Sequence, residues 1–133
     1  MQPRLPPDRI LQAARADAFI EDHAQALQIV ELLKTAATPP AAHEAARRAA
    51  GFLGPHMEEE EAVDGVFHWI RALEPGLSDE LERLSAEHLE IHQLLAQAVA
   101  ASPSQVVGLA RALATRLELH EAAERAALDR AVR

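Results

Sequence analysis

Clusters of turn-forming residues divide this chain into four long stretches and so limit the folds that it can adopt. Pro6-Pro7 precede the first stretch, and the internal clusters are Thr38-Pro39-Pro40, Glu74-Pro75-Gly76 and Ser102-Pro103-Ser104. The stretches between the clusters are rich in Ala, Leu and Glu, which favour helix. No run of β-branched and aromatic residues alternates as it would in a strand.

The four stretches predict four helices. We place them over residues 8–37, 41–73, 79–100 and 103 to near the C-terminus. Long helices with short connections pack against their neighbours in opposite directions. The sequence therefore predicts an all-α fold, an antiparallel up-down-up-down four-helix bundle. A length of 133 residues fits a single domain over residues 1–133, with residues 1–7 as a proline-rich N-terminal arm.

One position conflicts with this pattern. Gly51, Gly54 and Pro55 lie inside the predicted second helix. Proline cannot donate a backbone hydrogen bond, and inside a helix it costs about 3 kcal/mol or more. We therefore expect the helix either to kink at Pro55 or to restart there with Pro55 at its first position.

Composition excludes several classes of function. The chain has no cysteine, so thiol catalysis, cysteine-bound zinc and iron–sulfur clusters are ruled out. A net charge of −8 without a basic run, and only 3% aromatic residues, argue against nucleic-acid partners. No apolar stretch matches a secretory signal or a membrane span. We expect a cytoplasmic protein with no membrane partner.

Histidine is the unusual residue, because the chain has seven of them. Three pairs of metal-binding residue types have a spacing of four, which places both side chains on one helix face. The pairs are His56 with Glu60, His88 with His92, and His120 with Glu124, while His23 lies in the middle of the first predicted helix. Each predicted helix therefore offers ligands once.

Helix lengths give the depth of these residues in the bundle. His23, His56, Glu60 and His92 lie at matching distances from the helix ends that connect them. His88 and His120 match less well, with an offset of about 8 Å along the helix axis. The ligand depths thus agree for three of the four pairs of neighbouring helices.

A single His–Glu pair four residues apart arises easily by chance, but three pairs and His23 at nearly one level do not. Without a metal, these imidazoles and carboxylates would be costly to bury together. His43 and His68 have no partner at i+4, so we assign them to the surface or to packing. No His-Glu-x-x-His or Glu-x-x-His motif occurs, which excludes zincin and ferritin-like sites.

Seven ligands are too many for one tetrahedral zinc ion and suit two octahedral ions with bridging carboxylates. Imidazole and carboxylate ligands with an open position suit iron best, and zinc, manganese or cobalt less well. A haem held by two of the histidines would leave the other five ligands unexplained.

The motifs Glu21-Asp22-His23, HMEEEE from His56, HLEIH from His88 and HEAAE from His120 occur in this order along nearly the whole chain. Together they resemble the hemerythrin-like (HHE cation-binding) family. The resemblance implies two iron ions, bridged by Glu60, Glu124 and an oxo or hydroxo group. It implies that one iron is bound by His88, His92 and His120, and the other by His23 and His56, with an open position for O₂ or another small ligand.

An apolar pocket beside the open position would keep water out. Leu117 lies one turn before His120, and Leu27 lies one turn after His23, so both are candidates for this pocket. In one respect the sequence departs from the O₂ carriers of the family, which place an aspartate five residues after the fourth-helix histidine. Arg125 occupies that position here, and Glu124 supplies the carboxylate instead.

The resemblance therefore implies a non-haem di-iron protein that binds O₂, or a related small ligand such as nitric oxide or peroxide. It favours a ligand- and metal-binding protein over a dedicated enzyme. The alternatives are a di-iron enzyme similar to peroxidases or nitric oxide reductases, and a protein of iron homeostasis or storage.

Overall fold

The computed structural model of the chain describes residues 7–63 and 65–132, with side chains described from residue 19 onward. All of its regular structure in this part of the chain is helical, which confirms the predicted all-α fold. Residues 1–6 of the predicted N-terminal arm lie outside the described residues. The elements in chain order are α1 (Pro7–Thr35), α2 (Pro39–Glu61), α3 (Val66–Leu73), the 3₁₀ turn η1 (Pro75–Leu77), α4 (Ser78–Ala100) and α5 (Pro103–Val132).

Local chemistry explains where these helices begin. The Thr38 hydroxyl accepts a hydrogen bond from the backbone N–H of Ala41 at 3.3 Å, and so caps α2. Pro39 and Pro103 stand at the first positions of α2 and α5, where a missing backbone N–H costs nothing. Both starts lie within two residues of the predicted ones.

The predicted second helix, residues 41–73, is wrong, because the structure has two helices there. The break lies after Glu61, and Pro55 stays inside the continuous helix α2. Gly51 is exposed, so water can satisfy the carbonyl that Pro55 leaves without a donor. At Gly65 the backbone instead folds tightly over the end of α2, so that an added Cβ would lie 2.1 Å from the Glu59 carbonyl oxygen.

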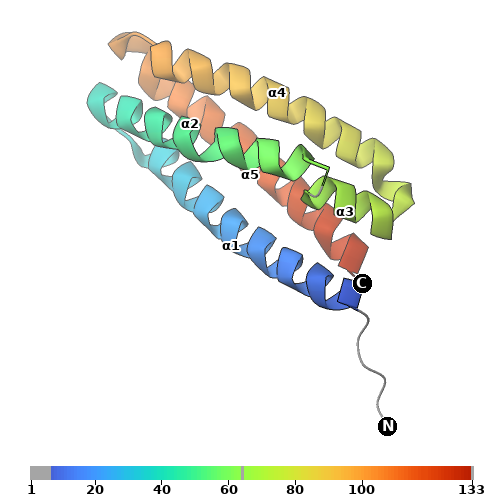
Figure 1. Cartoon of the computed structure of the whole chain (residues 1–133). Coiled ribbons are helices and arrows are strands. Elements are labelled where there is room, and N and C mark those ends of the chain that lie inside the picture. Colours follow the sequence, from blue (N-terminus) through green and yellow to red (C-terminus); the bar gives the residue numbers. More distant parts are fainter. Residues whose placement is uncertain (1–6, 64, 133) are drawn as a thin grey trace.

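The four long helices lie side by side, and α3 sits at the end of α2 (Figure 1). Helix α1 packs on α2 and α5, and α4 packs on the same two helices. The start of α1 and the end of α5 lie at the same end of the molecule (Figure 1). Each long helix therefore faces a common interior.

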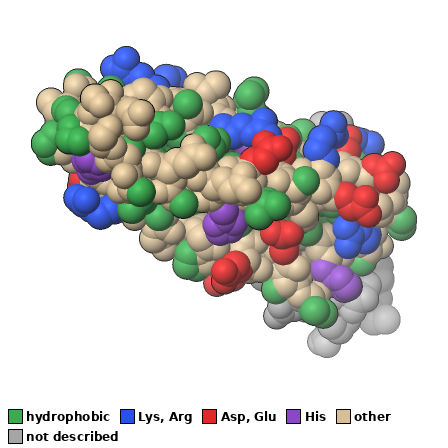
Figure 2. All heavy atoms as spheres, turned by 90° about the horizontal axis from the view of Figure 1, so that it is seen from above, with side chains coloured by type: hydrophobic (Ala, Val, Ile, Leu, Met, Phe, Trp, Pro, Cys, Tyr) green, Lys and Arg blue, Asp and Glu red, His purple; other side chains and the backbone are tan. Residues whose placement is uncertain are grey.

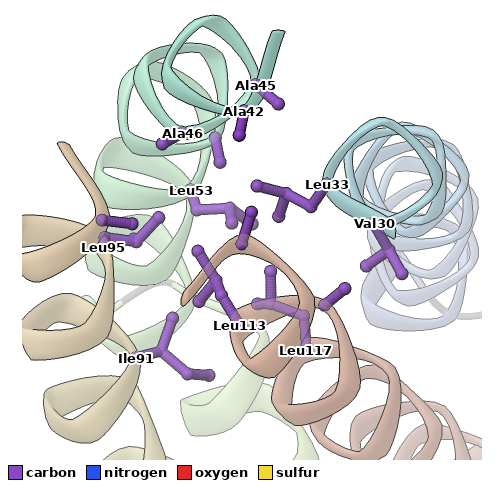
Figure 3. Close-up of a cluster of buried hydrophobic side chains, with 14 of the residues drawn as sticks. Val30, Leu33, Ala42, Ala45, Ala46, Leu53, Ile91, Leu95, Leu113 and Leu117 are labelled. Carbon is purple, nitrogen blue, oxygen red and sulfur yellow. The ribbon is translucent and has the colours of Figure 1, made fainter. Parts of the chain in front are cut away.

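The buried side chains form two separate clusters. The first is rich in alanine from α2, which meets larger side chains of α1, α4 and α5, such as Leu33, Leu95 and Leu113 (Figure 3). The second surrounds α3 and contains Phe67, Trp69 and Ile70. Val63 and Val99 lie outside both clusters and are 83% and 40% exposed. Val63 follows the end of α2, so the helical pattern does not extend to it.

Acidic and basic side chains are mixed on the face seen in Figure 2, with apolar side chains in small groups between them. Over the part of the chain that the structure describes, no helix is both long and apolar enough to cross a membrane.

Candidate metal centre

A polar layer separates the two apolar clusters. On α1 the half-buried His23 lies between Phe19 of the second cluster and Ala26 of the first. On α4, His88 lies between Leu84 and Ile91 in the same way. We call this the histidine layer and define it by His23, His56, Glu60, His88, His120 and Glu124. Every long helix contributes to it.

Four side chains at the centre of the layer lie close enough together to hold one cation. These are Glu60, His88, His120 and Glu124, which offer ligand atoms within 4.8 Å of one another. All four are buried, with 1–3% of their surface exposed. Their convergence follows from local helix geometry, because Glu124 is four residues after His120 and so shares its face.

The two oxygens of Glu60 face two different histidines. Glu60 Oε1 lies 3.3 Å from His88 Nε2, and Glu60 Oε2 lies 3.6 Å from His56 Nε2. Glu124 Oε1 faces Nε2 of His88, at 3.2 Å, and Nε2 of His120. A carboxylate placed between imidazoles in this way can bridge two metal ions.

Several polar atoms at this centre lack a hydrogen-bond partner although they are fully buried. They are both oxygens of Glu60, Glu124 Oε2 and His120 Nε2. Leaving such a group unpaired costs about 1–3 kcal/mol, and more for a charged one. The donor set is imidazole nitrogen and carboxylate oxygen, which suits iron, zinc and manganese. A bound cation would satisfy all four atoms.

The pKa values of Glu60 and Glu124 shift in opposite directions in this environment. Burial, followed by the neighbouring Glu124 carboxylate, raises the pKa of Glu60 well above 4.5. Burial also acts on Glu124, but its close contacts with Glu60, His120 and His88 outweigh it and lower the pKa of that carboxyl. Burial opposes the protonation of His120, yet its contact with the Glu124 carboxylate and its hydrogen bond with Glu87 raise the pKa of the imidazole. Protons are therefore held more tightly at Glu60 and His120 than in free side chains, and less tightly at Glu124.

The other ring nitrogen of each histidine in the layer faces a carboxylate. Nδ1 of His23, His88 and His120 lies at hydrogen-bond distance from Glu121 Oε2 (2.8 Å), Glu61 Oε2 (2.9 Å) and Glu87 Oε1 (2.8 Å). His56 Nδ1 lies 3.6 Å from Asp22 Oδ2. A carboxylate that accepts a hydrogen bond from Nδ1–H keeps the proton on Nδ1, and this leaves the lone pair of Nε2 free. Metal-binding histidines are commonly held in this way.

All three phenylalanines of the chain stack on histidines of this layer. Phe19 stacks on His23 and Phe52 on His56, in each case from one turn earlier on the same helix. Phe67 of α3 stacks on His88, with the ring centroids 5.2 Å apart. These contacts restrict the rotation of the imidazoles and keep water from their faces.

Three predicted ligands, His23, His56 and His92, lie outside the compact group of four. His23 is half-buried, and its only polar contact in the described part of the chain is with Glu121. His92 is half-buried on α4 and faces α2, where a Cβ added to Gly54 would lie 4.0 Å from its Cε1 atom. His56 links to the group through Glu60, and it also lies in a second cluster with Asp22 and Glu59.

The expected offset between His88 and His120 is wrong. Their ring centroids are 4.7 Å apart, so the two rings lie at one level. Side chains on a helix lean toward its N-terminus. On two helices joined by the two-residue segment 101–102, His88 therefore leans away from the connection and His120 leans toward it, which reduces the difference along the axis.

Leu27 does not fit the predicted apolar pocket, because it is 44% exposed on α1. The helix turns it away from the interior, while its neighbour Ala26 is buried. Leu117 is 1% exposed and packs in the first cluster (Figure 3). Of the two histidines assigned to packing or surface, His43 Nε2 bonds the Ala101 carbonyl at 2.8 Å, and His68 is exposed.

Sequence reasoning missed the carboxylates that contact Nδ1, although a signal was present. Asp22, Glu87 and Glu121 are each adjacent in sequence to a histidine of the layer, and Glu61 is adjacent to Glu60. Because each one serves a histidine of another helix, no spacing within one helix reveals the pairing.

Comparison with known proteins gives one match. The sequence model described as "Hemerythrin HHE cation binding domain" matches residues 15–128. No curated protein and no solved structure matched the chain significantly.

Proposed function

Since this chain belongs to the hemerythrin HHE cation-binding family, we propose that its histidine layer binds two iron ions. The side chains that would hold them are His23, His56, Glu60, His88, His92, His120 and Glu124. In this proposal His88, His92 and His120 would hold one iron, His23 and His56 would hold the other, and Glu60 and Glu124 would contribute carboxylates to both. The antiparallel up-down-up-down order of the helices is part of the proposal, and the short connections support it.

One observation carries this proposal. Where Nδ1 of His88 and His120 donates to a carboxylate, the Nε2 lone pairs point at the oxygens of Glu60 and Glu124. Lone pairs then face lone pairs in a buried space, and only protons or cations can stabilise such an arrangement. The family match and the donor set favour a metal cation as the occupant.

Bound iron would supply reversible redox binding of O₂ or of a related small ligand such as nitric oxide or peroxide. The chain's own residues would supply the environment for this chemistry. Phe19, Phe52 and Phe67 cover imidazole faces. Leu117 of the first cluster would exclude water on the side of His120.

The test is to load the full chain anaerobically with Fe²⁺, count the bound iron, and record the visible spectrum as air is admitted. Two irons per chain, with an absorption band that forms in air and fades when O₂ is removed, would support an oxygen-binding protein. Two irons that pass quickly to a stable ferric spectrum would favour a di-iron enzyme, assayed next with peroxide and nitric oxide. Ready loss of iron to a weak chelator would favour iron homeostasis.

Fewer than about one iron per chain would contradict the di-iron proposal. The matched control is His68→Ala, because His68 is exposed and lies outside the layer. It should bind as much iron as the unmodified chain.

A further inference from the structure

The four carboxylates that contact Nδ1 are arranged in a definite order around the bundle. Asp22 of α1 faces the histidine of α2, and Glu61 of α2 faces the histidine of α4. Glu87 of α4 faces the histidine of α5, and Glu121 of α5 faces the histidine of α1. Each helix thus gives one carboxylate and receives another, and the contacts cross the four interfaces α1–α2, α2–α4, α4–α5 and α5–α1.

The position of each carboxylate along its helix explains this order. On α1 and α4 the carboxylate comes one residue before the histidine of that helix; on α5 it comes one residue after, and on α2 five residues after. Successive residues on a helix point about 100° apart. When the histidine points inward, its neighbour therefore points toward an adjacent helix. A carboxylate before the histidine and one after it point to opposite sides of the helix, and reversing the direction of the helix exchanges these two sides. All four carboxylates therefore reach the next helix in the same sense round the bundle.

We propose that Asp22, Glu61, Glu87 and Glu121 are positioning residues that form a closed carboxylate circuit around the histidine layer. Each one holds the Nδ1 proton of an imidazole on the next helix, and so presents Nε2 to the interior for a cation. This inference rests on the proposed metal-binding function, but the geometry of the circuit does not depend on which metal binds.

The four members should not contribute equally. Glu121 is the most buried, with 3% of its side chain exposed, and its contact is 2.8 Å. Glu87 makes an equally short contact but is 21% exposed, and Glu61 is 41% exposed. Asp22 lies 3.6 Å from His56 and is 39% exposed, so its contact is the longest. We expect the effect of removal to follow this order, with Glu121 first and Asp22 last.

The first experiment reads the imidazole tautomers in the metal-free full chain. Nitrogen NMR of ¹⁵N-histidine-labelled protein, at a pH where the imidazoles are neutral, shows which ring nitrogen carries the proton. In the unmodified chain we expect Nδ1–H at His23, His88 and His120. In Glu87→Ala the proton should move from Nδ1 to Nε2 at His120 alone. Glu87→Gln should keep it on Nδ1, because the amide oxygen still accepts a hydrogen bond.

The second experiment measures the dissociation constant for Fe²⁺ under anaerobic conditions. Loss of a carboxylate that supports a metal-binding histidine costs about 10–100-fold in metal affinity. We expect this loss in Glu87→Ala and Glu121→Ala, and a smaller one in Asp22→Ala. Glu90→Ala and Glu118→Ala are matched controls on the same helices, because their carboxylates pair with Arg116 and Lys34 instead. These controls should keep the affinity of the unmodified chain.

The proposed circuit is wrong if the Nδ1 proton stays in place in Glu87→Ala. It is also wrong if the two controls weaken Fe²⁺ binding as much as Glu87→Ala and Glu121→Ala do. Should Glu121→Ala fail to fold, Glu61→Ala gives the same test at His88 with a carboxylate nearer the surface. If the unmodified chain binds no Fe²⁺, the proposed function fails while the tautomer experiment still decides the circuit. If it binds iron and the tautomers do not change, only the circuit fails.

Discussion

Glu60 and Glu124 are the same kind of side chain in the same buried layer, yet their pKa values shift in opposite directions. The difference comes from their partners. The contacts of Glu124 with Glu60 and with two imidazoles lower its pKa, whereas burial and the neighbouring Glu124 carboxylate raise the pKa of Glu60. Protons are therefore held more tightly at Glu60 than at Glu124, and a bound cation would compete with a proton at Glu60.

The stability of the metal-free protein should therefore fall as pH rises. The folded-state pKa of Glu60 is raised from 4.5, and that of His120 is raised from 6.5, so both groups stabilise the fold while protonated. Both contributions are lost as pH rises toward and through the folded-state pKa values. The lowered pKa of Glu124 acts in the opposite direction, and its contribution is lost only in acid.

We expect urea denaturation of the metal-free protein to give a lower free energy of unfolding at about pH 8 than at about pH 6. Glu60→Gln is the matched control, because the variant has no carboxyl to titrate at that position and should lose less stability over this range. A free energy of unfolding that rises from about pH 6 to about pH 8 would contradict the raised pKa values of Glu60 and His120.

Individual ligands can be tested by counting iron. His120→Ala or Glu124→Ala should lose most of one of the two proposed irons, because both residues lie in the compact group of four. His43→Ala should keep both, because His43 Nε2 bonds the Ala101 carbonyl at a distance from the layer. The measurement is iron per chain after desalting. Equal loss in His43→Ala and His120→Ala would overturn the ligand set.

At this level the sequence revealed what lies within one helix and little of what crosses between helices. The pair His120 and Glu124 is visible as a spacing of four, because the helix repeat places them on one face. The contact of His120 with Glu87 joins residues on different helices, so it depends on how those helices pack. Leu27 shows the same limit, because a position near the apolar face was read as buried and is exposed.

The end of α2 depends on the tight turn at Gly65. Between α2 and α3 the chain folds back so closely that only glycine fits at position 65. Glu60 and Glu61 end α2 directly before this turn, and they contribute one central carboxylate and one member of the carboxylate circuit. The position of both side chains therefore depends on the end of α2.

Gly65→Ala should destabilise the protein by about 1–3 kcal/mol, the usual cost of forcing extra volume into a packed site. The added Cβ would meet backbone atoms of Glu59 and Glu60, which cannot move without shifting the end of α2. Gly108→Ala is the matched control, because nothing lies within 4 Å of a Cβ added there. Alanine inside a helix should raise the stability by roughly 0.5–1 kcal/mol. Urea denaturation of the two variants measures both effects.

Helix starts were predictable from the sequence because they depend on local chemistry, as at Thr38 and Pro103. The break between α2 and α3 was not, because two local signals competed. Pro55 is the stronger breaker by propensity, yet it stays in the helix where its face is exposed. Helix α2 ends at Glu61 instead, and the chain turns at Gly65 so that α3 packs back on α2, which is a tertiary contact.

The bundle as a unit should gain stability from metal. A ligand that binds only the folded state stabilises it by mass action, by about 2.7 kcal/mol at 100 times its dissociation constant. For a chain of this length we expect the Tm to rise by roughly 10 °C in such an excess of Fe²⁺ under anaerobic conditions. Glu124→Ala should show a much smaller rise. An unchanged Tm in the unmodified chain would contradict a buried site shared by all the long helices.

The histidine layer also divides the apolar core into two parts that do not touch through apolar contacts of their own. Without a cation, the end that contains α3 and the start of α4 is joined to the rest through the side chains of the histidine layer and the continuous helices. Amide hydrogen exchange in residues 66–84 should then proceed through local opening, faster than exchange in residues 42–57. Adding Fe²⁺ should slow exchange at the α3 end until the two regions exchange together. In that case the metal would decide whether this chain unfolds in two steps or in one.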